Sequence, residues 1–101
     1  MRIISKAHLY AYADRNAGVR VHINSWIAEV EKASWNSSNE VKQQYRNASP
    51  VGNRRVVFNI KGNDHRLIVA MAYKMQTVYI KFIGTHKQYD TVDAETVTLE
   101  N

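Results

Sequence analysis

The stretch "GTHKQYD", residues 84–90, follows a run, "VYIKFI" (78–83), that alternates as a β-strand does. Four polar side chains with useful chemistry lie in it: His86, Lys87, Tyr89 and Asp90. An imidazole titrates near neutral pH, a lysine supplies positive charge, and a phenol can stack on a base or donate a proton. Two interpretations are open. These side chains either cap a helix and face water, or they converge on a substrate.

Metal-free RNA cleavage fits the available residue types best. RNA supplies its own nucleophile, the 2′-hydroxyl, so the protein needs a base, an acid for the leaving 5′-oxygen, and cations for the charge on phosphorus. His86 can act as acid or base, Arg66 can hold a phosphate bidentately, and Tyr89 can stack or transfer a proton. Lys81 and Lys87 can add positive charge. Each side chain also has an ordinary alternative, as a capping or solvated residue, a core tyrosine, or an arginine paired with a nearby aspartate.

Other reaction classes find less support. The four histidines show no metal-ligand spacing and cysteine is absent. The sequence has no GxxxxGK[ST] or GxGxxG loop, and no serine on a tight strand-to-helix turn. The acidic residues fall mostly in predicted helices or near the C-terminus, away from one shared pocket. We therefore expect no metal and no cofactor.

The bulk properties predict one globular domain, residues 1–101. The absence of cysteine excludes disulfides and thiolate chemistry, and it fits a reducing compartment. The first residues hold only a short apolar run, and no stretch approaches the length of a membrane span. We expect a cytoplasmic protein with no membrane partner.

The charge favours a polyanion as partner. The chain carries 14 Lys+Arg against 9 Asp+Glu, a net charge of +5. Residues 51–90 hold seven basic and two acidic groups, whereas residues 91–101 hold three acidic groups and no basic one. A basic segment of this kind suits nucleic acid, although solubility alone would also explain it.

The order of predicted elements indicates an α+β, two-layer fold. A short strand (2–5) precedes amphipathic helical segments, and three β-branched runs follow as an antiparallel meander. The helical segments are 6–17, 19–33 and 37–48, and the meander strands are 55–60, 66–73 and 77–83. Ser37 and Glu40 have capping-box spacing, and Pro50 prevents further helix. We expect the N-terminal strand and helices to pack on one face of the sheet.

Strand alternation assigns the two faces of this sheet. We expect Val78, Ile80 and Phe82 to face the helices, together with alternate residues of 55–60. Tyr79 and Lys81 then fall on the opposite face, together with Asn59. If His86 and Tyr89 fold back beside that second face, they join Lys81 and Arg66 in a basic, aromatic cleft.

Two blocks carry a resemblance to a known family. "NRRVVFNIKGNDHRLIVAMAY" (53–73) and "VYIKFIGTHKQYD" (78–90) resemble the HigB family of type II toxins, in the RelE-like group. Upstream, "SWIAEVEKASWNSSNEVKQQYRNAS" (25–49) is similar to that family's helical segment, with Trp35 after the second helix. The resemblance covers nearly the whole chain. One departure is the turn, which often reads "GGN" in the family and here has Lys61 in the first position and Asp64 after Asn63.

The resemblance implies a RelE-like fold and a ribosome-dependent mRNA endoribonuclease that halts translation. It also implies a HigA-like helix-turn-helix antitoxin as partner. The motif residues that match are Val57, Phe58, Asn59, Ile60, Gly62, Asn63, Arg66, Thr85, His86, Tyr89 and Asp90. We expect catalysis from His86, Tyr89, Arg66 and Lys81. We expect contacts with mRNA from Arg54, Arg55, Asn59, Lys61, Asn63 and Lys87.

Two alternatives from other classes remain at this stage. The first is a non-catalytic RNA-binding module of α+β type, such as a double-stranded-RNA-binding domain. That domain has a basic cluster after its third strand, whereas this chain reads "HKQYDTVDAE" there, with one lysine and three acids. The second is a structural partner of a regulatory complex with no catalytic activity.

Overall fold

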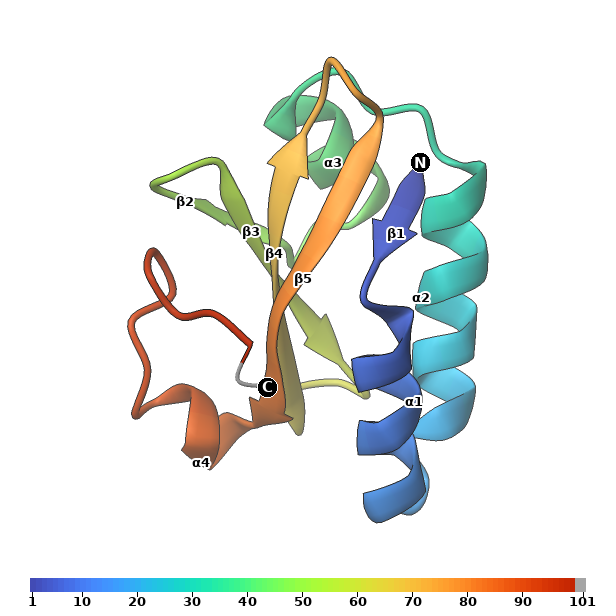
Figure 1. Cartoon of the computed structure of the whole chain (residues 1–101), viewed down its shortest axis with the longest axis vertical. Helices are drawn as coiled ribbons and strands as arrows, with labels where there is room; N and C mark the ends of the chain where they lie inside the picture. The colour runs from blue at the N-terminus through green and yellow to red at the C-terminus, as the bar shows by residue number, and fades with distance from the viewer. Residues whose placement is uncertain (100–101) are drawn as a thin grey trace.

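The computed structural model describes residues 1–99, in which helices cover one face of a sheet (Figure 1). The elements in chain order are β1 (Arg2–Ile4), α1 (Lys6–Arg15), α2 (Arg20–Lys32), α3 (Ser38–Gln44), β2 (Ser49–Val51), β3 (Arg55–Ile60), β4 (His65–Ala72), β5 (Thr77–Thr85) and α4 (His86–Tyr89). None of the helices within the described residues is long and apolar enough to cross a membrane.

The sheet has five strands in the order β1-β5-β4-β3-β2. The β2 to β5 strands pair antiparallel, as the meander predicts, whereas β1 pairs parallel with β5. The predicted α+β class is confirmed. The sheet is mixed because β1 runs parallel to β5. The N-terminal strand is an edge strand of the sheet and does not pack on its face, which differs from the expectation.

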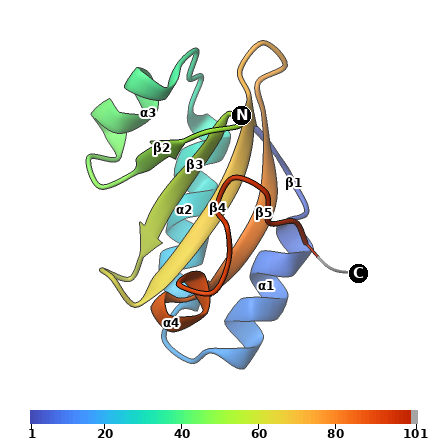
Figure 2. The ribbon, with the colours of Figure 1, turned by 90° about the vertical axis from the view of Figure 1, so that its left-hand side faces the viewer.

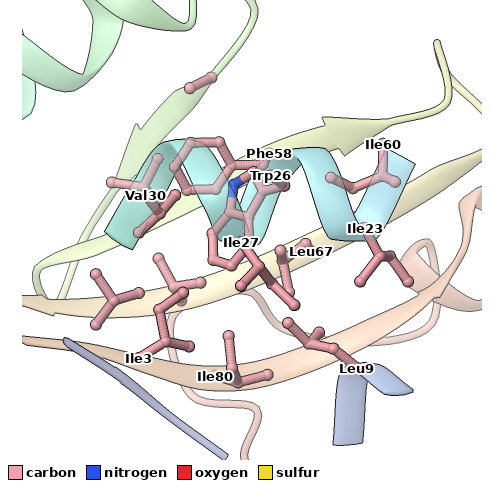
Figure 3. Close-up of a cluster of buried hydrophobic side chains, with 14 of the residues drawn as sticks. Ile3, Leu9, Ile23, Trp26, Ile27, Val30, Phe58, Ile60, Leu67 and Ile80 are labelled. Atoms are coloured by element: carbon pink, nitrogen blue, oxygen red, sulfur yellow. The ribbon is translucent and has the colours of Figure 1, made fainter. Parts of the chain in front are cut away.

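The core lies between α1, α2 and the sheet (Figure 3). Along α2, four residues at helical spacing are buried: Ile23, Trp26, Ile27 and Val30. They meet alternate residues of the strands, such as Phe58 of β3 and Leu67 of β4. Burying each such side chain contributes about 1.5–3 kcal/mol, so this layer holds the strand ends in fixed positions.

The assignment of faces along β5 was wrong in its second half. Val69 pairs with Ile80 and Ile68 with Phe82, so Lys81 is an extra, bulged residue. A bulge inserts one residue and reverses the alternation beyond it. Ile83 therefore packs against the core, and Phe82 lies on the second face.

Element bounds and two short elements also differ from the predictions. The middle strand begins at His65 and the last continues to Thr85. Neither β2 nor α4 was predicted. Pro50 lies in β2, an edge strand, where a residue without an N–H is tolerated. Ser37 Oγ accepts from the Glu40 N–H at 3.4 Å, as the capping pattern predicts.

Residues 90–99, which we call the C-terminal segment, cross the second face in front of β4 and β5 (Figure 2). The Arg55 guanidinium donates through Nη1 to the carbonyls of Ala94, at 3.1 Å, and Val97. Val57 and Ile68 of the second face are only 3% and 0% exposed. The second face is therefore covered over much of its area and is not the open mixed surface that alternation suggested.

Candidate functional site

The turn between β3 and β4 (residues 61–64) and helix α4 lie side by side at one end of the sheet (Figure 2). The cause is strand pairing, since His65 at the start of β4 lies opposite Thr85 at the end of β5. The His86 backbone N–H donates to the Asp64 carbonyl at 3.0 Å. This contact joins the turn to the first residue of α4.

Arg66 of β4, paired with Asn59 of β3 and Gly84 of β5, supplies a positive charge at this end of the sheet. Its Nη1 donates to the Asn63 carbonyl at 2.9 Å and the His65 carbonyl at 3.3 Å. Its guanidinium carbon lies 5.7 Å from the centroid of the Tyr89 ring, a cation–π distance. Within residues 1–99, Arg66 forms no ion pair with a carboxylate, so its charge is not neutralised by Asp64 or Asp90.

Helix α4 owes its position to a capping box. The Thr85 hydroxyl accepts from the Gln88 N–H at 3.2 Å, and the Gln88 side-chain oxygen accepts from the Thr85 N–H at 2.9 Å. Gly84 stands opposite Arg66, and a Cβ on it would lie 2.6 Å from Cζ of Phe82. The absence of a side chain at residue 84 lets the Phe82 ring and Gln88 pack beneath α4.

His86 points outward from the first turn of α4. Its side chain is 57% exposed, and its Nε2 lies 3.8 Å from Oδ1 of Asp90, which is 63% exposed. The Thr85 and Gln88 side chains thus accept hydrogen bonds from backbone N–H groups at the start of α4, and His86 is not needed as a cap. The capping interpretation is confirmed for Thr85 and Gln88. Convergence of His86, Tyr89 and Asp90 on a substrate stays a prediction. We call Arg66, His86, Tyr89 and Asp90 the turn cluster.

Lys81, the fourth predicted catalytic residue, lies elsewhere. As the bulged residue of β5 it reaches the Tyr79 ring, with Nζ 5.9 Å from the centroid. It also lines a cavity of about 270 Å³ between α1 and the C-terminal segment, together with His8 and Arg15. No hydrogen bond or ion pair within residues 1–99 joins Lys81 to the turn cluster.

Arg54 and Arg55, at the start of β3, lie in two different environments. Arg55 is 7% exposed and holds the C-terminal segment, which argues against contact between this side chain and RNA. Arg54 is exposed, but it precedes β3 and lies at the opposite end of that strand from the turn 61–64. At about 3.3 Å per residue, six strand residues separate it from the turn cluster by roughly 20 Å.

The remaining predicted RNA contacts lie around the turn. Asn59 faces Arg66 across the strand pair, and its Nδ2 lies 3.5 Å from Oδ1 of Asn63. Lys61 is exposed and has a φ of 55°, in the left-handed region that favours glycine. Lys87 is exposed on α4. The structure therefore brings Asn59, Asn63 and Lys87 close to the turn cluster, whereas the Lys61 ammonium lies near Gly18, between α1 and α2.

A buried polar pair behind the cluster was missed by sequence reasoning. The Tyr12 hydroxyl of α1 and Nδ1 of His65 share a hydrogen bond of 2.6 Å, and both side chains are buried. Burial lowers the pKa of His65 below its usual 6.5, with Lys61 and His22 acting in the same direction and Asp64 opposing them. Burial also raises the pKa of Tyr12. No sequence motif links residues so far apart.

Among the described residues, no three His, Cys, Asp or Glu side chains gather as a metal site would require. The turn cluster itself offers an exposed imidazole, a phenol and a guanidinium that forms no ion pair within residues 1–99. This combination can hold a phosphodiester and move protons at its oxygens.

Helices on one face of a mixed five-stranded sheet, with a basic and aromatic cluster at one end, define a small RelE-like α+β domain. The family model HigB_toxin, described as the RelE-like toxic component of a toxin-antitoxin system, matches residues 19–92, well over half of the chain. The chain belongs to this family and is the toxin of a toxin–antitoxin system, with an antitoxin as partner. The comparison with curated proteins finds no match.

The matched range contains the turn cluster, α2 and the whole meander. It ends before most of the C-terminal segment and begins after Tyr12. The "GGN" position of the family's turn coincides with Lys61, and the positive φ there gives the physical reason for a glycine. In this chain a lysine adopts that conformation at a cost of about 1–2 kcal/mol, and its ammonium lies near Gly18.

Proposed function

We propose that this toxin is a ribosome-dependent mRNA endoribonuclease that inhibits translation. The observation that carries the proposal is the turn cluster, in which Arg66 stacks on Tyr89 without a carboxylate partner while His86 stands exposed on the adjoining helix. A cation held ready for an anion, beside two groups able to transfer protons, is what cleavage by an internal 2′-hydroxyl requires.

The reaction would proceed without a metal. The 2′-oxygen attacks phosphorus as a base takes its proton, and the P–O5′ bond breaks as an acid protonates the 5′-oxygen. The products are a 2′,3′-cyclic phosphate and a 5′-hydroxyl. His86 and Tyr89 are the two groups we assign to the proton transfers, and Arg66 stabilises the negative charge on the phosphoryl oxygens.

Contacts with mRNA come from Asn59, Asn63 and Lys87 around the cluster and from Lys61, the first residue of the same turn. Lys81 contributes positive charge at longer range from β5, and Arg54 does so from the far end of β3. The partner we propose is a HigA-like helix-turn-helix antitoxin. Action on translating ribosomes would make the cytoplasm its site of action.

The test is a reconstituted translation reaction with a defined mRNA. Wild-type protein should cut the mRNA only when ribosomes are present, and the 5′ fragments should end in a cyclic phosphate. Arg66→Ala should lose most of this activity. Lys74→Ala is a matched control, because Lys74 is an exposed cation in the β4–β5 turn, at the far end of β4 from Arg66. Folded protein that leaves the mRNA intact on ribosomes would refute the proposal and favour a non-catalytic RNA-binding module.

A further inference from the structure

A polar groove runs along the free edge of β3. Strand β2 pairs only with Arg55–Val57, so the rest of β3 has no strand beside it on that edge. A cavity of about 270 Å³ opens there against residues 44–48, and a second of about 120 Å³ opens between α2 and the turn 61–64. The two cavities are neighbours, because Tyr45 and Asn59 line both of them. We call the two cavities together the edge groove.

The lining of the edge groove combines aromatic rings with amides. Tyr45 supplies a half-buried ring, whereas Phe58 and Trp26 behind it are only 1% and 2% exposed and belong to the core. Asn47 and Asn59 are the asparagines of the lining. The Trp26 side chain is 2% exposed, and its indole Nε1–H has no hydrogen-bond partner within residues 1–99. One partly exposed ring beside polar side chains can stack on an unpaired nucleobase and form hydrogen bonds with its edge.

The charge of the edge groove suits a phosphate-linked ligand. Arg46 and Lys61 line it, and both are exposed. The one carboxylate among its lining residues, Glu29, accepts a hydrogen bond from the Tyr45 hydroxyl. Burial, together with this contact, raises the pKa of Tyr45, so its hydroxyl stays neutral. The groove therefore presents more positive than negative charge to solvent.

The edge groove and the turn cluster share the turn 61–64 as a wall. Lys61 and Gly62 line the groove, whereas the Asn63 carbonyl accepts from Arg66 in the cluster. Asn59, which lines the groove, lies directly opposite Arg66, and such cross-strand partners have Cβ atoms about 5 Å apart. A phosphate held by Arg66 thus leaves the adjoining nucleotide within reach of the groove.

We propose that the edge groove binds an unpaired nucleobase next to the phosphate held by the turn cluster. Asn59 and Asn47 form hydrogen bonds with the base, Tyr45 supplies a ring face, and Arg46 and Lys61 contact its phosphate. The position of the base next to that phosphate rests on the proposed endoribonuclease function, but binding in the groove does not require cleavage.

The experiment titrates the ¹⁵N-labelled full chain with a trinucleotide of 2′-O-methyl RNA, which has no free 2′-hydroxyl and cannot be cut. The backbone amides of Asn47, Asn59 and Gly62 should shift in a saturable manner. Arg46→Ala should raise the Kd several-fold. Lys42→Ala is the matched control: it removes one exposed cation from α3, outside the groove, and should leave the Kd unchanged.

Every outcome decides the proposal. Shifts confined to Arg66 and Tyr89 would overturn it while leaving RNA binding by the turn cluster intact, and an absence of shifts would overturn it too. Equal increases in Kd for Arg46→Ala and Lys42→Ala would also overturn it, because binding would then depend only on the general positive charge of the protein. Groove shifts in a protein that never cuts mRNA would support the groove and refute the endoribonuclease, so the two proposals can fail separately.

Discussion

Replacing His86 by alanine separates chemistry from structure more cleanly than any other change in the turn cluster. The side chain is 57% exposed, and its single ionic contact is with an Asp90 that is 63% exposed. Exposed pairs of this kind contribute little to stability. The bond from the His86 N–H to the Asp64 carbonyl is made by the backbone and survives in alanine. The free energy of unfolding should therefore change by no more than about 0.5 kcal/mol.

The effect on cleavage should be far larger. Loss of a general acid or base typically costs ~10²–10⁴-fold in rate. At about 1.4 kcal/mol per factor of ten, this corresponds to roughly 3–5 kcal/mol in the activation barrier, several times the expected change in stability. The assay measures the melting temperature and ribosome-dependent mRNA cleavage on the same preparations.

Thr85→Ala is the control for a loosened helix. It removes the hydroxyl that accepts from Gln88 and should cost about 1 kcal/mol of local stability, but it leaves the imidazole in place. Its loss of cleavage should be much smaller than that of His86→Ala. If His86→Ala melts several degrees lower and loses activity only in proportion, the residue is structural. If the variant is stable and still cleaves, another group moves the proton, and Tyr89→Phe becomes the next variant.

Three further predictions concern the surroundings of the cluster. Gly84→Ala should lower the melting temperature by several degrees in calorimetry, because the new Cβ would lie 2.6 Å from Phe82 Cζ and overpacking costs about 1–3 kcal/mol; an unchanged melting temperature would contradict this packing. The pKa of His65 is lower in the folded protein than in the unfolded chain, so protonation of this imidazole favours unfolding. The free energy of unfolding should be highest above pH 6.5 and should fall as the pH drops through the folded-state pKa of His65. Denaturant unfolding at several pH values checks this, and a flat profile from neutral pH downward would be the contrary result. Arg55→Met should speed hydrogen exchange in the C-terminal segment, because it removes the bonds to Ala94 and Val97, and should leave the salt dependence of RNA binding unchanged. Arg66→Ala should reduce the slope of log K against log salt by about 0.7. A smaller slope for Arg55→Met would show that Arg55 contacts a phosphate.

Periodicity predicted the layers of this fold well, because burial on one face is a local property of a helix or strand. The stripe along α2 is buried as its spacing indicates, and β3 has the predicted bounds of 55–60. Basic and aromatic residues at strand ends likewise pointed to Arg66, His86 and Tyr89, because adjacent antiparallel strands bring the ends of β4 and β5 together.

What sequence could not supply were the contacts between distant segments. The bulge at Lys81 depends on how β5 pairs with β4, and it moved both that lysine and Phe82 away from their expected surroundings. Residues 90–99 have no hydrophobic periodicity, so their sequence did not predict that they cover the second face and bury Arg55. The Tyr12–His65 pair spans 53 residues of sequence and could only be seen once the chain was folded.

Because the C-terminal segment covers the second face, the turn 61–64 at the end of the sheet is where the two proposed binding surfaces meet. The C-terminal segment lies over β4 and β5, and its carbonyls accept from Arg55 at one end of the sheet. Arg66, at the other end, donates to carbonyls of the turn and its own strand instead. The turn then forms a wall of both the turn cluster and the edge groove, with Asn63 on one side and Lys61 on the other. Its two left-handed residues, Lys61 and Gly62, fix the positions of both walls together. A change in this short turn should therefore alter base recognition and phosphate binding at once, while a change in the core should affect both only through stability.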